Sequence, residues 1–538
     1  MATQWQTFPV EFRGGLLSNM SLLQQGIGAV GSARILQNFE VNKEGGYSKI
    51  RGYEKFSDTE IPGVDEVLGL KIVSSGRYIA ARKVDADAVT AYPSDLVSGD
   101  IGKTAYYYST GTTWNFTALG PTANAGKVRH ASFNFDGDDK IIFVDGTNYP
   151  SIYNTNGNVH TFLNASSPNI ISDAEGAEFV VIFKNTAFYS NGNTLLFTAP
   201  FTVDDFSAAN GAGSIGLAHD ITGLAVFRDQ LIVFTTDTIS RLTGNTSADF
   251  RLAPITEKIG CINGDTIQEV GGDIMYLSPD GIRQLSATDR IGDFALDVAS
   301  DKIKEDFNDF IGGSTQFASC IIREKSQYRL FSYKASQPRI SAQGLIATKV
   351  TTQGSAGIEW STIKGIKAYV SDSTYSGNTE SIGFANSDGY AYTMDTTGSF
   401  DGADIEAIFE SAYMPISDPQ VRKTFYKAVW YINPIGDMAL SFNVKYDFES
   451  TSRNNVIQPD VINISTASLG AVSFFGGGGL FGATSPPGAS FGGTLERIYP
   501  TNIIGSGNTI SLRIADLSTN PTFTLDTAVL EFKTNDRQ

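Results

Sequence analysis

The residues able to do catalytic or metal chemistry are few and scattered along this chain. Its histidines, His130, His160 and His219, include no pair at the spacing of zinc ligands in a helix or hairpin. The sequence contains no G-x-S-x-G nucleophile motif and no phosphate-binding loop. Cys261 and Cys320 are too few for a disulfide framework and are expected to be buried thiols. We therefore expect no enzyme activity, no catalytic residue, no metal site and no cofactor.

One acidic cluster could bind a cation. Asp136, Asp138, Asp139 and Asp145 would offer the hard oxygen ligands that calcium prefers, but they do not follow the twelve-residue helix–loop–helix pattern. The alternative interpretation is a pair of hairpin turns. Paired carboxylates can also hydrolyse glycosidic bonds, yet no pair here is distinguished from the other turn residues. We expect turns at these positions.

The elements that must position any site are short strands in a repeating pattern. Residues 221–244 read as strand, turn, strand, turn, strand, because short β-branched and aromatic runs alternate with polar turns. The same pattern occurs 44 residues earlier and 43 residues later, so that Phe183 aligns with Phe227 and Leu231 aligns with Ile274. All-β units with a period near 43 residues are typical of propeller blades, which bury their faces by stacking around an axis.

Further units extend the repeat in both directions. They lie at residues 67–116, 128–146 and 317–333, and a last unit at 382–394 leaves the choice between six and seven blades open. The only convincing helix is expected at 291–310, where apolar residues recur on one face. The fold class is therefore mainly β, a β-propeller of six to seven blades plus a small β-sandwich or platform region.

Composition supports a folded all-β chain and argues against a tight nucleic-acid binder. Of 538 residues, 41% are hydrophobic, 18% are charged and 55 are glycine. The formal net charge of −17 is the opposite of what clustered phosphate contacts require. No apolar run approaches the roughly 20 residues of a spanning helix, and the N-terminus has no signal pattern. We expect synthesis in a cytoplasm and no membrane insertion by this sequence.

Changes in pattern suggest three regions. Residues 1–60 form an N-terminal platform segment, 61–395 form the propeller, and 396–538 form a β-sandwich. The sandwich is interrupted by an inserted Gly/Phe-rich loop at about 452–500. Because so apolar a loop is costly to leave in water, it is expected at a subunit contact or at the distal tip. The candidate residues for that contact are Phe474, Phe475, Leu480 and Phe481.

Three stretches in order carry a resemblance to a known family. The first combines FRGGL at 12–16, GSARILQNFE at 31–40 and GGYSKIRGYEK at 45–55. The second is LFTAPFTVDDF at 196–206 followed by the repeat unit already described, and the third is 409–430. Together they resemble tail-nozzle proteins of short-tailed bacteriophages (podoviruses), which are also called tubular tail or packaged-DNA stabilisation proteins.

The resemblance implies a structural protein of the virion tail. Its members would form a homo-hexameric tube below the connector, in contact with the tail adaptor ring and with tail fibres or spikes. Double-stranded DNA would be retained by the tube and would pass through it during ejection without sequence-specific binding. The candidate assembly residues are Asn38, Phe39, Gly46, Tyr47, Arg51, Gly52, Tyr53, Arg422 and Lys423.

Alternatives to the nozzle remain at this stage. One is a host-surface glycan-binding or glycan-cleaving tail protein, and another is a propeller binding module unrelated to virions. Arg422 and Lys423 have the simpler interpretation of solvated charges at a strand end. For the nozzle we also expect the platform segment and the C-terminal sandwich to lie together, and a channel with more acidic than basic side chains.

Overall fold

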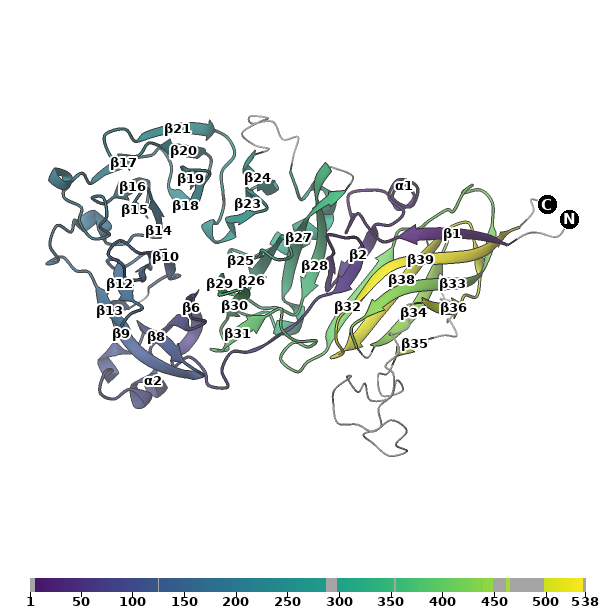
Figure 1. Cartoon of the computed structure of the whole chain (residues 1–538), viewed down its shortest axis with the longest axis horizontal. Coiled ribbons are helices and arrows are strands. Elements are labelled where there is room, and N and C mark those ends of the chain that lie inside the picture. The colour runs from purple at the N-terminus through teal and green to yellow at the C-terminus, as the bar shows by residue number, and fades with distance from the viewer. Residues whose placement is uncertain are drawn as a thin grey trace, which may run out of the picture.

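The chain folds into a β-propeller and a β-sandwich that lie side by side (Figure 1). The computed structural model describes residues 5–123, 125–286, 298–352, 355–436, 438–448, 461–464 and 498–535. Both termini lie at the end of the sandwich that is farthest from the propeller. The expected fold class, mainly β with a propeller and a sandwich, is confirmed.

Six separate antiparallel sheets of the described chain are propeller blades. The first three are β6 (Val64–Ile72), β7 (Tyr78–Lys83), β8 (Lys103–Thr110) and β9 (Thr113–Ala123); β10 (Arg129–Phe133), β11 (Lys140–Val144), β12 (Ser151–Asn154) and β13 (Val159–Phe162); and β14 (Phe179–Phe183), β15 (Thr186–Asn191), β16 (Thr194–Phe197) and β17 (Gly213–Gly216). The others are β18 (Ile221–Phe227), β19 (Gln230–Thr235), β20 (Ile239–Thr243) and β21 (Arg251–Thr256); β22 (Gln268–Val270), β23 (Asp273–Ser278) and β24 (Gly281–Gln284); and β29 (Val370–Ser376), β30 (Thr379–Ala385) and β31 (Ala391–Met394) with β5 (Tyr53–Lys55).

Part of a nine-stranded sheet occupies the remaining position in the ring. Its strands there are β25 (Gln316–Ile322), β26 (Gln327–Tyr333), β27 (Gln343–Thr352) and β28 (Ser355–Lys364). Strand β25 contacts β22 on one side and β29 on the other, and β29 contacts β6. The N-terminal strand β5 pairs with β31, so the start and end of the propeller share one blade and close the ring.

The repeat follows from local turn chemistry and apolar alternation. Lys184 and Asn185, like Arg228 and Asp229, have positive φ in two-residue hairpins, the backbone that matches the twist of the flanking strands. Leu231 is completely buried between the third and fourth blades. The predicted register of the three central units is confirmed.

The sandwich is built from two sheets. One contains β1 (Gln6–Glu11), β3 (Phe39–Val41), β4 (Tyr47–Lys49), β33 (Lys423–Pro434), β36 (Ile498–Asn502), β37 (Ser506–Gly507) and β39 (Phe523–Thr534). The other is the rest of the nine-stranded sheet, which contains β2 (Ala33–Gln37), β32 (Ile405–Ser411), β34 (Met438–Tyr446), β35 (Val461–Ile464) and β38 (Ile510–Ser518).

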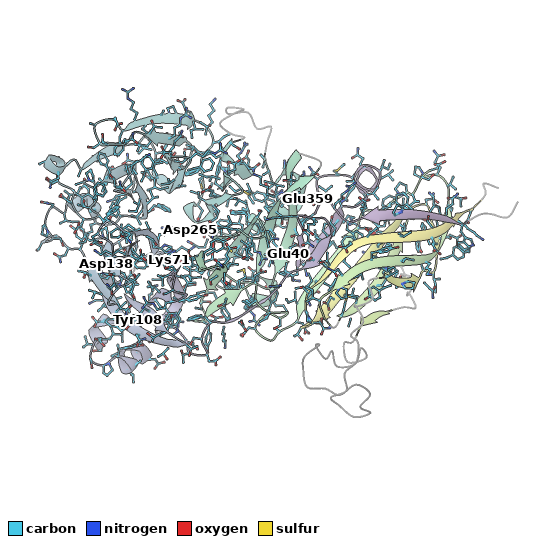
Figure 2. The ribbon with its side chains drawn as sticks, in the orientation of Figure 1. Glu40, Lys71, Tyr108, Asp138, Asp265 and Glu359 are labelled. Atoms are coloured by element: carbon cyan, nitrogen blue, oxygen red, sulfur yellow. The ribbon has the colours of Figure 1, made fainter. Side chains whose placement is uncertain are left out.

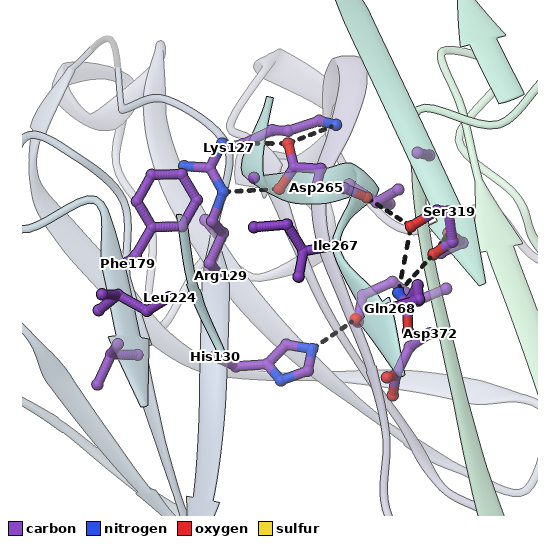
Figure 3. Close-up of a pocket in the computed structure, with 17 residues that line it drawn as sticks. Lys127, Arg129, His130, Phe179, Leu224, Asp265, Ile267, Gln268, Ser319 and Asp372 are labelled. Atoms are coloured by element: carbon purple, nitrogen blue, oxygen red, sulfur yellow. Dashed lines mark hydrogen bonds and ion pairs between the residues drawn. The ribbon is translucent and has the colours of Figure 1, made fainter. Parts of the chain in front are cut away.

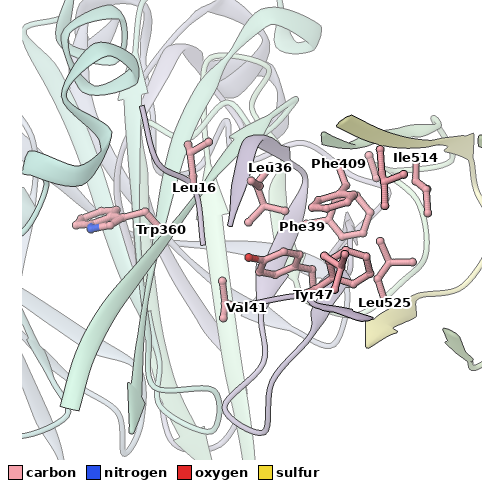
Figure 4. Close-up of a cluster of buried hydrophobic side chains, with 14 of the residues drawn as sticks. Leu16, Leu36, Phe39, Val41, Tyr47, Trp360, Phe409, Ile514 and Leu525 are labelled. Atoms are coloured by element: carbon pink, nitrogen blue, oxygen red, sulfur yellow. The ribbon is translucent and has the colours of Figure 1, made fainter. Parts of the chain in front are cut away.

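A large apolar core fills the space between these sheets (Figure 4). Phe39 and Tyr47 from the N-terminal strands pack with Phe409 and Leu525 from the C-terminal ones. Because β39 pairs with both β1 and β4, residues from the two ends of the chain complete one sheet. The expectation that they lie together, with the propeller inserted between them, is confirmed.

Asn38 is the point where propeller and sandwich are joined. It has φ of 54° and is buried, between β2 and β3. Its side-chain amide donates to the carbonyls of Lys364 and Glu406, and its amide oxygen accepts from the backbone N–H of Lys364. Lys364 ends β28 of the propeller and Glu406 lies on β32 of the sandwich, so the Asn38 side chain hydrogen-bonds to both domains.

The remaining elements are short helices, and they correct two expectations. The α-helices are α1 (Leu22–Gly28), α2 (Ala86–Ala91) and α4 (Lys304–Ile311), and the 3-10 turns are η1 (Ser98–Asp100), η2 (Ser172–Ala174), η3 (Ala208–Asn210), η4 (Gly264–Thr266), η5 (Asp301–Ile303) and η6 (Arg339–Ser341). The helix expected at 291–310 is described only from residue 298, and Val298 lies in a β-bridge with Arg283 instead of on the helix. The idea of a single helix was wrong because α1 and α2 are too short to show a clear apolar period.

One expected domain boundary changes, and another cannot be compared with the described residues. Strand β5 belongs to a blade, although residues 1–60 were expected to form a separate platform segment. The predicted boundary at residue 60 was wrong because β5 has only three residues, too few to show a periodic pattern. Its pairing with β31 assigns it to the blade. Most of the Gly/Phe-rich loop, including Phe474, Phe475, Leu480 and Phe481, lies outside the described residues.

We predict that Leu231→Asp destabilises the propeller by several kcal/mol, because it places an unpaired carboxylate in a fully buried position. Val226, its cross-strand partner, is 37% exposed, and Val226→Asp should cost much less. Thermal and chemical unfolding followed by circular dichroism would measure both. Equal melting temperatures for Leu231→Asp and wild type would contradict the blade register.

We predict that Asn38→Ala lowers the free energy of unfolding by about 3 kcal/mol, because it removes three buried hydrogen bonds and retains a strained backbone. Asn169 has a similar φ of 58° but is exposed, so Asn169→Ala isolates the backbone cost, about 1 kcal/mol. Urea unfolding of the two variants compares them directly. A cost at Asn38 no larger than that at Asn169 would rule out the joint described above.

Candidate functional site

The axis of the propeller holds a polar cavity of about 230 Å³ (Figure 3). Its walls come from β6, β10, β14, β18, β22, β25 and β29, the inner strand of each blade, and from η4. Aliphatic residues such as Leu70, Leu224 and Ile267 share the lining with charged and hydroxyl side chains. The axis is therefore the place where residues from all blades meet.

An ion cluster crosses one side of this cavity. Asp265 accepts from Arg129 Nε at 2.7 Å and Nη2 at 3.1 Å, and from Lys127 Nζ at 3.2 Å. Lys127 also donates to the Phe317 carbonyl, and the Arg129 guanidinium stacks over the Phe179 ring at 4.2 Å. One carboxylate thus ties β10 and the segment before it to η4, with contacts reaching β14 and β25.

The local backbone of η4 positions the carboxylate. Asn263 caps this turn by accepting from the backbone N–H of Asp265. A Cβ on Gly264 would lie 2.3 Å from the Thr222 carbonyl oxygen and 2.5 Å from the Phe179 ring, so only glycine fits between two neighbouring blades. The turn can therefore approach the axis closely enough for Asp265 to reach both cations.

The cluster shifts the ionisation of its members. Burial opposes the charged form of Asp265, but Lys127 and Arg129 outweigh it and hold the pKa of that carboxyl well below its usual range. Burial, aided by the charge of Lys71, lowers the pKa of His130 to about 4. With a pKa of about 4 the His130 ring is neutral at pH 7, and its Nε2, 3.2 Å from the Leu70 carbonyl, donates to it.

A second set of contacts closes the other side of the cavity. Lys71 Nζ lies 3.1 Å from Asp372 Oδ2, which also accepts from the backbone N–H of Ile72. Ser319 Oγ donates to the Asp265 carbonyl and accepts from Gln268 Nε2. These polar groups are bonded to one another, so the arrangement links the blades across the axis.

A comparable ion network lies where the propeller meets the sandwich, in the region of Glu40 in Figure 2. Glu40 lies 2.8 Å from Lys325 and 3.1 Å from the fully buried Arg329. Both cations also contact Asp395, at 2.8 and 3.3 Å, and Gln327 donates to Glu40. Two anions balance two cations, so this network fixes β3 against the propeller without a net charge.

The acidic cluster considered for calcium forms turns. Asp136 pairs with Lys140, Asp138 accepts from Asn154, and Asp139 accepts from Asn134. Asp145 lies apart and binds the backbone and side chain of the turn that follows it. Figure 2 shows Asp138 farther out than Lys71 and Asp265. The turn interpretation is therefore confirmed.

The other candidate reactive residues are separated. His160 packs among aromatic rings and contacts Ser151, whereas His219 lies 3.7 Å from Asp237 at the surface. Cys261 and Cys320 are free and buried, and burial raises the pKa of each thiol to about 12. Within the described ranges, no group of three His, Cys, Asp or Glu side chains could hold a metal ion. No helix found there has the length and apolar character needed to span a membrane.

Most candidate assembly residues are buried in the fold of their own chain. Asn38, Phe39, Gly46, Tyr47, Gly52 and Tyr53 are buried, and Arg51 is exposed. A Cβ on Gly52 would lie 1.8 Å from the Ser399 carbonyl oxygen, and Tyr53 stacks on Phe400. The expectation of direct subunit contact is wrong for these six buried residues, because they pack between strands of their own chain.

The two basic residues at the start of β33 have different surroundings. Arg422 is exposed and bonds Ser506, so it remains available for contact. Lys423 is buried, and its Nζ donates to the carbonyls of Pro415, Asp418 and Asn508. The interpretation of Lys423 as a solvated charge and the one as a docking contact are both wrong. Its buried ammonium instead binds the loop before β33 through the Pro415 and Asp418 carbonyls.

Comparisons with protein-family models and with curated proteins give no match. Among solved structures, the chain is similar to U3-55K, with 9% identity, a TM-score of 0.39, and coverage of 64% of this chain and 100% of that one. It is also similar to the extracellular domain of the putative hybrid two-component system BT4673 from B. thetaiotaomicron, with 8% identity, a TM-score of 0.36, and coverage of 72% and 45%. We draw no function from these similarities.

Sequence reasoning missed Lys127, Arg129 and Asp265. The available signal was two basic residues two positions apart at the start of an inner strand, where they point to the same side. Nothing in the sequence connects them with a carboxylate 136 positions beyond Arg129. The pairing depends on the closed ring, which brings the second and fifth blades to one axis.

We predict that Asp265→Asn destabilises the protein by about 3–5 kcal/mol at pH 7, because two buried cations lose their shared counter-charge. The carboxyl has a depressed pKa in the folded state, so its contribution is present above the unfolded pKa of about 3.9 and is lost as pH falls below it. The gap between wild type and variant should therefore shrink below about pH 4. Asp136→Asn, at an exposed turn, is the control, and a gap independent of pH would contradict this assignment.

Proposed function

We propose that this chain is a structural component of a bacteriophage short tail, a subunit of a hexameric nozzle that retains packaged DNA and conducts it during ejection. The observation that carries the proposal is the placement of the residues by which the chain resembles tail-nozzle proteins. Asn38, Phe39, Tyr47 and Tyr53 build the joint between sandwich and propeller. The resemblance therefore concerns the architecture of the chain and not an isolated surface motif.

The axial geometry supports a wall-forming role for the propeller. A cavity of about 230 Å³, crossed by ion pairs, is far too small to pass a duplex through a single chain. In a nozzle, DNA would instead pass through the space enclosed by several copies. The nine-stranded sheet that continues from propeller into sandwich makes each copy a stiff building block for such a wall.

Charge supports weak contact with DNA. Residues 53–395 contain 40 Asp and Glu against 26 Lys and Arg, so the propeller region carries most of the net charge of −17. Six copies would carry a charge of roughly −100, and repulsion within about 8 Å of the wall would keep a duplex centred. A channel with more acidic than basic side chains is part of this proposal.

The second candidate, a host-surface glycan-binding or glycan-cleaving tail protein, has one observation in its favour: the axial cavity is polar and aromatic rings lie near it. Its polar groups, however, bond to one another as described above. Incubation of the protein with host capsule or cell wall should release no oligosaccharide. Release of sugars by wild type would favour the second candidate.

We predict that electron microscopy of the purified protein, or of virions containing it, shows rings of six copies with an open central channel. The rings should bind double-stranded DNA weakly at low salt, because an acidic wall gains no counterion release. Gel-shift titration from 20 to 200 mM salt would test the second part. Trimers with closed axes, or tight and salt-sensitive DNA binding, would contradict the nozzle as proposed.

A further inference from the structure

Helix α1 presents its apolar residues to solvent and buries Gln25 and Gly26. Leu22 is 38% exposed, Leu23 39% and Ile27 59%, and Met20 just before the helix is 38% exposed. A helix on a protein surface normally turns its apolar stripe toward the core, so this orientation is inverted.

The inverted orientation is held by specific contacts. Gln25 Nε2 donates to Ser32 Oγ and to the Ala33 carbonyl, both at 3.1 Å. Gly26 lies so close to the chain that a Cβ would be 1.8 Å from the Tyr413 carbonyl oxygen. Rotating α1 to bury its leucines would break the Gln25 hydrogen bonds. It would also move Gly26 away from the Tyr413 backbone, where only glycine fits.

Acidic side chains lie beside the segment that leads into α1. The backbone N–H of Ser18 donates to the Lys302 carbonyl, and Asn19 bonds Asp301, so η5 and α4 lie directly beside the segment leading into α1. Asp301, Glu305 and Asp309 are exposed there. Lys302 directs its ammonium to the Ile358 carbonyl. Residues 301–309 carry four acidic side chains against two basic ones, Lys302 and Lys304, so the surface beside the start of α1 is net negative.

A second unpartnered patch lies at the far end of the sandwich, and its charge is positive. Trp5 and Tyr426 are 50% and 40% exposed and pack edge to face with ring centroids 4.2 Å apart. Lys533 Nζ lies 4.3 Å from the Trp5 ring, and exposed Arg422 begins the same edge of the sandwich. We call these four residues the aromatic patch.

The two patches cannot cover each other within one chain. Strand β1 begins beside Trp5 and runs toward α1 (Figure 1). Six residues of strand span about 20 Å, so the patches lie near opposite ends of β1. Two different surfaces of one chain that are complementary in charge form a head-to-tail contact, the type that closes a ring.

From this complementarity we propose that the apolar face of α1, with Asp301, Glu305 and Asp309, binds the aromatic patch of a second copy of this chain. The proposal rests on the proposed function, since it names the subunit contact of the ring. Trp5 and Tyr426 supply the aromatic area typical of interface anchors, and Leu22, Leu23 and Ile27 supply the surface on which they pack. Lys533 and Arg422 pair with the acidic side chains of the neighbour.

Variants of the full-length protein test the contact by sedimentation velocity and mass photometry over a range of concentrations. Leu23→Asp combined with Ile27→Asp should weaken assembly at least tenfold, which is about the effect of losing a strong interface residue. Ile340→Asp is the matched control, because Ile340 is 78% exposed on the propeller. Circular dichroism of each variant confirms that it folds.

Charge reversal distinguishes a contact from general damage. Lys533→Glu with Arg422→Glu should weaken assembly, as should Glu305→Lys with Asp309→Lys in the other patch. A protein with all four changes should assemble nearly as wild type does, because the complementarity is restored with opposite signs. Damage to the fold would not be rescued in this way.

The outcomes separate this contact from the nozzle itself. If wild type forms rings but Leu23→Asp with Ile27→Asp also forms them, or the fourfold variant is no better than the twofold ones, this contact is wrong and the nozzle stands. If wild type stays monomeric at every concentration, both are overturned. Binding of monomeric wild type, but not the α1 variant, to anionic phospholipid vesicles would make a membrane the occupant and would also overturn the proposal.

Discussion

The arrangement of the two domains depends on one buried amide. Asn38 bonds β28 of the propeller and β32 of the sandwich at a backbone angle that few residues adopt. Around it the nine-stranded sheet runs from one domain into the other, and Glu40 with Arg329 adds ion pairs on the same side. A chain joined by shared strands has no hinge of the kind that a linker provides, and the proposed tube wall would need such stiffness.

A single short strand closes the propeller. Strand β5 comes from the N-terminal segment and completes the last blade, so the ring opens only if both ends of the inserted domain separate. At the axis, Asp265 holds two cations from another blade. Polar groups that a binding protein would direct to a ligand are used here to fasten blades together, as the proposed structural role would require.

Local features could be predicted from the sequence. Phe227, Leu231 and Ile274 repeat with the blade, and their burial follows directly from alternation within strands. Turn residues such as Arg228 and Asp229 marked hairpins correctly because turn chemistry is local. The candidate assembly residues that are buried could not be recognised as such for a different reason. Phe39 and Tyr47 were recognisable as a motif, but a motif does not say whether its side chains face solvent or a distant strand.

The sequence by itself determined the propeller repeat and the absence of the common catalytic and phosphate-binding motifs, because both follow from the spacing of residues along the chain. It also determined that the two chain ends lie together, because the repeats stand between two non-repeating segments. Tertiary structure decided which charges meet and which surfaces remain open. Arg129 finds Asp265 only when the ring closes, and Asn38 finds Glu406 only when two sheets join. The exposed leucines of α1 depend on the Tyr413 backbone lying against Gly26. Such contacts join residues more than one hundred positions apart, and the energy that orients them exists only in the packed state.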